Sequence, residues 1–262
     1  MNLPNLLWKN EESHHPTRVQ QAFNIALVSA FMLGVLLWAF YSLDYTLRLD
    51  TVYLYRAKFI DGFLMTIIIA FFSLILSLII GSFLAFAGKS RFLPLHYFSK
   101  AYVEIIRGTP LLVQIYVFFY IIATAMHLSN RYVLGVIILS VFSGAYICEI
   151  IRAGIESIEA SQIETARSLG FTSYQRYRYI IIPQVFKRIL PPLAGQLVSL
   201  IKDSSLLSVI AVSELTKNVQ EVDSFTFATF ENYIVLALLY MILTVPISYA
   251  SKVLERKFNY EA

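Results

Sequence analysis

Two adjacent charged residues, Lys202 and Asp203, stand near the middle of a strongly apolar segment. A charge at the centre of a membrane helix costs about 2.5–3.5 kcal/mol, so both side chains are expected to face a bundle interior or a wet cavity. There the lysine could bind a carboxylate and the aspartate an amine, which would suit a zwitterionic solute. Because consecutive residues point about 100° apart on a helix, an ion pair between these two is not expected.

The same two charges also have a structural interpretation. They could pin neighbouring helices together, with help from the hydroxyl groups of Ser199, Ser204 and Ser205. Gln114 and Glu149 are weaker candidates of the same kind, and we expect them to act mainly as hydrogen-bond partners between helices. The candidate solute path therefore comprises Lys202, Asp203, Ser204, Gln114 and Glu149.

The sequence contains no pattern typical of covalent catalysis or of metal binding. Its four histidines are scattered, without Cys, His, Asp or Glu grouped around them, so we predict no catalytic residues and no metal ligands. Gly88-Lys89-Ser90 resembles the end of a phosphate-binding loop, but Phe83 stands where that loop needs a glycine. We therefore expect no cofactor in this chain.

Composition indicates a membrane protein. Of the 262 residues, 58% are hydrophobic and only 15% are charged, and the mean hydropathy is +0.66. A soluble domain has no place for so much apolar surface, so the expected fold is an all-α polytopic membrane protein. The basic residues follow the membrane topology and do not form one patch, so nucleic acid is not an expected partner.

Six apolar segments are predicted to cross the bilayer, each as one helix. They are residues 22–43, 63–87, 111–126, 133–151, 189–212 and 233–250. Between the second and third, residues 91–107 are predicted to lie at the membrane interface. Residues 213–231 are polar and mildly acidic, and are expected to form a short helix in an external loop.

Residue spacing predicts two ion pairs and one helix cap near the third and fourth spans. Glu104 and Arg107 have the i,i+3 spacing of an ion pair, and so do Glu149 and Arg152 at the end of the fourth span. Thr109 is the predicted N-cap of the third span, with Pro110 as its first helical residue.

The orientation of the spans follows from the basic residues, which gather on the cytoplasmic side of membrane proteins. Five basic residues fall on the side predicted to be external: Arg48, Arg56, Lys58, Arg131 and Lys217. Fifteen fall on the opposite side: Lys9, Arg18, Lys89, Arg91, Lys100, Arg107, Arg152, Arg167, Arg176, Arg178, Lys187, Arg188, Lys252, Arg256 and Lys257. We therefore predict that both termini are cytoplasmic.

The longest polar interval between two apolar segments spans residues 161–183. Ser161-x-x-Glu164 has the spacing of a capping box, in which each side chain bonds the backbone amide of the other residue. Gly170 follows and can adopt the left-handed conformation that ends a helix at low cost. A short helix between these signals is therefore predicted.

A second helix is predicted directly afterwards. Thr172-x-x-Gln175 is another capping box, and this helix is expected to run to Pro183. The result would be a rigid helix–turn–helix on the cytoplasmic side that presents the arginines Arg167, Arg176 and Arg178.

At these residues the chain resembles the permease subunits of bacterial ABC importers. Glu164-Thr165-Ala166, Gly170 and Ile180-x-Ile182-Pro183 match the spacing of the EAA loop of that family, with Thr165 for the usual alanine and Ile182 for the usual leucine. The resemblance implies that this loop is the coupling helix, which docks in a groove of an ATP-hydrolysing subunit. The implied coupling residues are Glu164, Ala166, Arg167, Ser168, Gly170 and Pro183.

Three further stretches resemble the branch of the family that transports polar amino acids such as histidine, glutamate, glutamine, arginine and opines. They are EIIRGTPLLVQ at 104–114, AYICEIIR at 145–152 and KDSSL at 202–206. The resemblance covers about residues 59–257, the five-helix type I core, with the coupling loop at 155–183. Residues 1–58 add a tail, one helix and a loop in front, and residues 258–262 form a tail.

The resemblance implies an assembly in the bacterial inner membrane. The chain would pair with a second permease copy or a paralogue, two ATP-binding cassette subunits and a periplasmic or lipid-anchored solute-binding protein. ATP and Mg²⁺ would bind to the cassette subunits, and this chain would carry a polar amino acid across the membrane without being an enzyme.

Two other classes of function are compatible with parts of the sequence. An ion-coupled secondary transporter of small polar solutes would use inverted repeats and a titratable midplane site, and Lys202-Asp203 fits this only mildly. A membrane scaffold would account for the hydropathy, but not for the clustered motifs.

The charge bias generates a topological prediction. Reporters fused after Ala262 or inserted near Ser168 are expected to read as cytoplasmic, and a reporter inserted near Lys217 as external. Paired alkaline phosphatase and fluorescent protein fusions measure this. A cytoplasmic reading at Lys217 would exclude the six-span topology.

Overall fold

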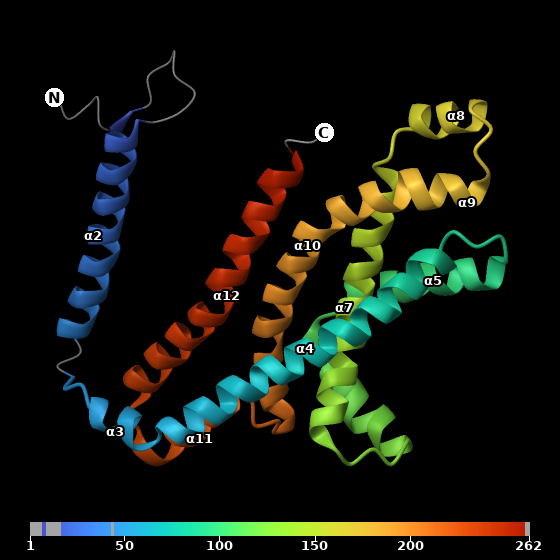
Figure 1. The fold of residues 1–262 in the computed structure, drawn as a ribbon. Helices are drawn as coiled ribbons and strands as arrows, with labels where there is room; N and C mark the ends of the chain where they lie inside the picture. Colours follow the sequence, from blue (N-terminus) through green and yellow to red (C-terminus); the bar gives the residue numbers. More distant parts are fainter. Residues whose placement is uncertain (1–6, 9–16, 43–44, 260–262) are drawn as a thin grey trace. The chain divides into compact units, whose positions relative to one another are not determined.

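The computed structural model describes residues 7–8, 17–42 and 45–259 (Figure 1). The chain divides into two compact units, residues 1–48 and 49–262. In the first unit, α2 (Arg18–Ser42) is a helix long and apolar enough to cross a membrane. Residue 43, the last of the first predicted span, lies outside the described residues.

The described residues of the second unit form helices joined by short loops, without strands. Its first half contains α3 (Leu49–Leu54), α4 (Arg56–Ala87), α5 (Leu93–Gly108), α6 (Leu111–Val117), the π-helical η1 (Phe118–Ala123) and α7 (Arg131–Glu156). Its second half contains α8 (Ala160–Ser168), α9 (Ser173–Arg176), the π-helical η2 (Tyr177–Ile181), α10 (Ile182–Asp203), the 3₁₀ helix η3 (Ser204–Ile210), α11 (Leu215–Thr226) and α12 (Thr229–Asn259).

The packing of α4 against α7 forms the centre of this unit. A Cβ atom added to Gly81 would lie 2.6 Å from the Ile147 side chain, and one added to Gly144 would lie 2.7 Å from Ile80. Small residues at such a contact let two membrane helices approach closely. Buried serines on both helices extend the contact, and Ser140 Oγ donates a hydrogen bond to the Ser73 carbonyl at 3.2 Å.

The predicted number of membrane spans is confirmed, with a different composition for the third. In the described residues five helices have the length and hydropathy of a span, and α5 with α6–η1, bent by 110°, counts as a sixth when the pair is taken as one broken span. Residues 111–123 alone would rise only about 20 Å, less than the hydrocarbon core of a bilayer. The third span therefore needs α5, which the sequence assigned to the interface.

The bend corrects one predicted cap. Thr109 ends α5 instead of capping α6, and its hydroxyl donates to the Ile105 carbonyl at 2.9 Å. Pro110, predicted as the first helical residue, is the N-cap of α6 in an extended conformation. The Thr109 hydroxyl accepts a hydrogen bond from the Gln114 side chain at 2.8 Å, and no side chain in the described residues caps the first backbone amides of α6.

The fifth span is longer than predicted. The helix that begins at Ser173 does not end at Pro183 but continues through η2 and α10 to Ile210. Proline lacks the N–H that an α-helix needs, and a π-helical turn before it widens the helix where that bond is missing. Pro191 and Pro192, predicted at the start of the span, lie inside α10.

The helix predicted within residues 213–231 is present as α11 and is held across the ends of α4 and α12. Glu214 is fully buried and accepts hydrogen bonds from the backbone amides of Thr216 and Lys217 and from the Tyr240 hydroxyl. Thr66 on α4 accepts from the Leu215 amide at 3.2 Å. The first turn of α11 is thus bonded to both spans.

Burial raises the pKa of Glu214 from 4.5 to about 7, although the two backbone hydrogen bonds act in the opposite direction. The folded state therefore binds this proton more tightly than the unfolded state does. It follows that stability contributed at this site is present below about pH 4.5 and is lost as the pH rises to about 7.

Glu214→Gln should remove this pH dependence, because an amide does not titrate. We expect the midpoint of thermal unfolding to fall less in the variant than in the parent between pH 5 and pH 8. Differential scanning fluorimetry in detergent measures it, with Glu255→Gln, an exposed residue of α12, as the matched control. Equal slopes in parent and Glu214→Gln would contradict the assignment.

Candidate functional site

A helical hairpin connects α7 to α10 and protrudes from the bundle (Figure 1). Its first helix, α8, ends in the predicted left-handed glycine, since Gly170 has φ +79°. The Gly170 amide bonds the Arg167 carbonyl, and the Phe171 amide bonds the Ala166 carbonyl. These two bonds form a Schellman motif, which closes the helix and turns the chain.

The start of α8 differs from the prediction. The N-cap is Glu159, and Ser161 donates its hydroxyl to the Glu159 carboxylate at 3.1 Å instead of capping the helix with Glu164. Ile158 is buried before the cap and Ile163 packs against it. This hydrophobic staple between the residue before the cap and the fourth helical residue sets the boundary two residues earlier.

The second predicted capping box is confirmed. Thr172 accepts from the Gln175 amide, and the Gln175 side chain accepts from the Thr172 amide at 2.8 Å. The box begins α9 immediately after the glycine turn. The connection between the two helices is therefore short and is hydrogen-bonded at both of its ends.

The base of the hairpin packs against the ends of α7 and α10 and is hydrogen-bonded to them. Ile181 and Val185 are buried against Ile158. Arg188 donates to the Ser157 carbonyl, and Gln184 donates to Gln162 at 2.8 Å. These contacts join the base of the hairpin to both spans, so a displacement of the hairpin would be transmitted to them.

The tip of the hairpin is open to solvent. Of the sequence-predicted coupling residues only Ala166 is buried; Glu164, Arg167, Ser168, Gly170 and Pro183 are exposed. Leu169 is 70% exposed and Tyr174 is 74% exposed. Large apolar side chains beside arginines on an exposed hairpin are typical of a surface that a protein partner covers.

A chain of ion pairs links α5 to the end of α7. Arg107 Nη1 lies 3.0 Å from Glu149 Oε2, which also bonds Arg152 at 2.8 Å, and Arg152 reaches Glu156. The predicted pair of Glu149 and Arg152 is therefore confirmed. The predicted pairing of Arg107 with Glu104 is wrong, because the helix packing brings Glu149 within reach of Arg107 instead.

Gln114 and Glu149 serve as hydrogen-bond partners between elements, as predicted. Gln114 Nε2 donates to the Ile106 carbonyl at 2.7 Å and to Thr109 Oγ1 at 2.8 Å, so it holds the bend between α5 and α6. Its Oε1 atom is buried and has no hydrogen-bond partner in the described part of the chain. That oxygen can accept one more hydrogen bond.

Lys202, Asp203 and Ser204 lie at the junction of α10 and η3, not at the middle of a long helix. Lys202 is exposed, Asp203 is half-buried, and Ser204 is buried with its hydroxyl donating to the Ile201 carbonyl. Among residues 45–259 no hydrogen bond or ion pair joins Lys202 or Asp203 to Gln114 or Glu149. The structure therefore does not unite the five path candidates by direct contact.

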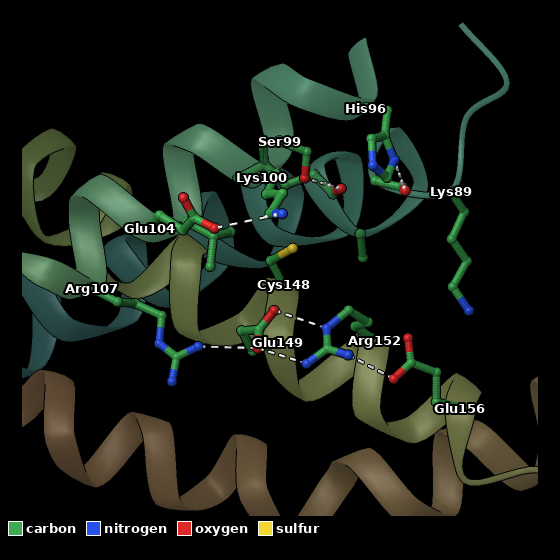
Figure 2. A pocket seen from close by; sticks show the side chains of 14 residues that line it. Lys89, His96, Ser99, Lys100, Glu104, Arg107, Cys148, Glu149, Arg152 and Glu156 are labelled. Carbon is green, nitrogen blue, oxygen red and sulfur yellow. Dashed lines mark hydrogen bonds and ion pairs between the residues drawn. The ribbon is translucent and has the colours of Figure 1, made fainter. Parts of the chain in front are cut away.

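A pocket of about 420 Å³ opens between α4, α5 and α7, and Figure 2 shows the ion pairs of Glu149 along one side of it. Sequence reasoning missed it, because its lining comes from three separate elements. Lining residues are Leu84, Ala85, Gly88, Lys89, His96, Ser99, Lys100, Val103, Glu104, Arg107, Cys148, Glu149, Arg152 and Glu156.

Comparison with protein families defines the class of this protein. Residues 77–260 match the family described as "binding-protein-dependent transport system inner membrane component". The chain belongs to this family, the membrane-spanning permease subunits of ABC importers. Family membership favours the importer over the ion-coupled secondary transporter.

Two similar proteins are named as permeases of glutamine transporters. The chain is 38% identical over 203 residues to the probable glutamine ABC transporter permease protein GlnM of Bacillus subtilis, covering 78% of this chain and 94% of that protein. It is 34% identical over 202 residues to the glutamine transport system permease protein GlnP of Escherichia coli K12, covering 76% and 92%.

Solved structures agree with this assignment. A crystal structure of an amino acid ABC transporter with histidines superimposes with a TM-score of 0.76 at 36% identity, over 81% of this chain and all of that one. An inward-facing form of the MetNI methionine ABC transporter superimposes with a TM-score of 0.61 at 19% identity, over 81% and 99%, and shows a shared fold.

Proposed function

We propose that this chain is the permease subunit of an ATP-driven importer of polar amino acids, with glutamine as the first substrate to test. The observation that carries the proposal is the hairpin of α8 and α9, which is exposed at its tip and anchored at its base in two spans. Glutamine is suggested by the named relatives, which are 34–38% identical over most of their length.

The coupling step follows from this geometry. Two ATP-binding cassette subunits would contact the exposed hairpin and move it as a rigid body when they bind and hydrolyse ATP. Ile158, Ile181 and Val185 would carry that movement into α7 and α10. Alternating access needs such a two-state element, and a closed turn at Gly170 keeps the hairpin stiff enough to act as one.

The remaining partners complete the proposed complex. A second permease copy or a paralogue would form the other half of the pathway. A periplasmic or lipid-anchored solute-binding protein would deliver the amino acid, with both termini of this chain in the cytoplasm. ATP and Mg²⁺ would be held by the cassette subunits alone, and this chain would catalyse no covalent step.

The solute path is proposed to involve three polar side chains: the exposed Lys202, the half-buried Asp203 and the buried Gln114. A glutamine zwitterion carries a carboxylate, an ammonium group and an amide. Lys202 and Asp203 supply one charge of each sign at the end of α10, and Gln114 supplies a buried acceptor without a partner in residues 45–259. Glu149 is already bonded to two arginines, so we assign it to holding α5 on α7.

The coupling proposal predicts a specific defect for Gly170→Arg. A left-handed backbone costs a residue with a Cβ atom about 1–2 kcal/mol, whereas nothing lies within 4 Å of a Cβ atom at this position. We expect normal insertion and assembly, at least tenfold slower uptake, and ATPase activity that no longer responds to the loaded binding protein. Proteoliposome assays of uptake and ATP hydrolysis measure these quantities.

Gly170→Asn is the matched control, because asparagine tolerates the left-handed conformation and should retain most uptake.

A cysteine introduced at Ser168 should crosslink to the cassette subunit when Gly170 is kept, and less efficiently when Gly170→Arg is also present. Glu164→Ala should leave α8 intact, since Glu164 does not cap it, and should reduce only this crosslink and uptake. Undiminished uptake by Gly170→Arg would exclude the hairpin as the coupling element.

The solute-path proposal predicts that Asp203→Asn lowers glutamine uptake at least tenfold while complex yield and thermal stability stay unchanged. Asp61→Asn, an exposed aspartate of α4, provides the same chemical change elsewhere. A parallel loss of yield, stability and uptake in Asp203→Asn would instead identify a structural pair. Failure of the parent complex to transport glutamine in competition with other amino acids would exclude that substrate.

A further inference from the structure

The pocket between α4, α5 and α7 lies where two spans end. On one side its lining runs from Leu84 in the last turn of α4 to Lys89 in the turn after that helix, and on the other from Cys148 to Glu156 in the last turns of α7. Both helices are long and apolar enough to cross a membrane. Because α7 leads directly to α8, the pocket is on the side of the membrane that carries the hairpin. Basic residues at the end of a spanning helix are expected at the level of the lipid headgroups.

The charges around the pocket do not cancel. Four of its lining residues are permanent cations and three are carboxylates, which leaves a net charge of +1. Arg107 and Arg152 are bonded to Glu149 and Glu156, while Lys100 Nζ is 4.0 Å from Glu104. In the described residues no carboxylate oxygen lies within 4.0 Å of Lys89 Nζ. The uncompensated positive charge is therefore at the Lys89 end.

Figure 2 shows Lys89 at one end of the pocket, with Lys100 on the α5 side and Cys148 between the two rows of charged residues. The inner wall is apolar and is formed by Leu84, Ala85 and Val103. A ligand that fits both parts must combine an anionic group with an apolar body.

The outer face of α5 indicates contact with lipid. Phe92, Leu93, Tyr97 and Phe98 are each more than half exposed around the first turns of this helix. Aromatic side chains next to lysines are typical of the level at which a membrane meets water. A molecule that occupies the pocket would therefore have acyl chains as its natural neighbours.

We propose that this pocket binds the headgroup of an anionic phospholipid, with its phosphodiester against Lys89 and Lys100. A phosphodiester carries one negative charge, which matches the net charge of the lining, and basic pockets between membrane helices are suited to such headgroups. A zwitterionic lipid or a free amino acid would leave the excess positive charge uncompensated. This proposal depends only on the location of the chain in a membrane, not on the transported solute.

Native mass spectrometry of the delipidated complex, titrated with phosphatidylglycerol, tests the proposal. The dissociation constant for phosphatidylglycerol should rise about fivefold in Lys89→Gln, and about fivefold again in Lys89→Gln/Lys100→Gln. Both lysines are exposed, so these changes should not impair folding. Lys252→Gln, an exposed residue at the end of α12 outside the pocket, is the matched control and should bind like the parent.

Three outcomes would overturn the proposal. The first is equal weakening in Lys252→Gln and the pocket variants, which would indicate attraction to the surface in general. The second is binding of phosphatidylcholine as tight as that of phosphatidylglycerol. The third is displacement of the lipid by millimolar glutamine or inorganic phosphate, which would identify a site for a free solute. Glutamine uptake by the same preparation is scored separately, so failure of the proposed substrate is distinguished from failure of this site.

Discussion

The close contact between α4 and α7 is the constraint on which the rest of the second unit depends. Because lipid chains are as apolar as leucine, these helices gain little from hiding apolar surface and associate through close packing and hydrogen bonds. Gly81, Gly144 and the buried serines provide both. Once the two helices are fixed, α5 can pack against both of them, and α10 can pack beside α7.

The charged groups follow from that packing. Glu149 is tolerable on a spanning helix because two arginines, one of them from α5, bond its carboxylate. Gln114 has the same role for the backbone at the bend between α5 and α6. Residues of α5 from His96 to Arg107 also line the pocket, so the ion pairs and the pocket share one origin in the position of α5.

The hairpin shows how a soluble surface is attached to a membrane bundle. Its interior has only a few buried residues, and its helices are short, so its stability must come from caps and from its base. The Schellman turn, the capping box at Thr172 and the contacts of Ile158 supply these. The tip can therefore present exposed apolar and basic side chains without losing its shape.

The sequence by itself determined the helical membrane class, the number of spans, the glycine turn and the second capping box. These depend on composition, hydropathy and contacts within four residues, all of which are local. Tertiary structure decided that Ile158 would set the start of α8, that Arg107 would bond Glu149 instead of Glu104, and that the fifth span would pass through Pro183. Each of these outcomes depends on which distant residue is brought within reach, and spacing along the chain contains no measure of that distance.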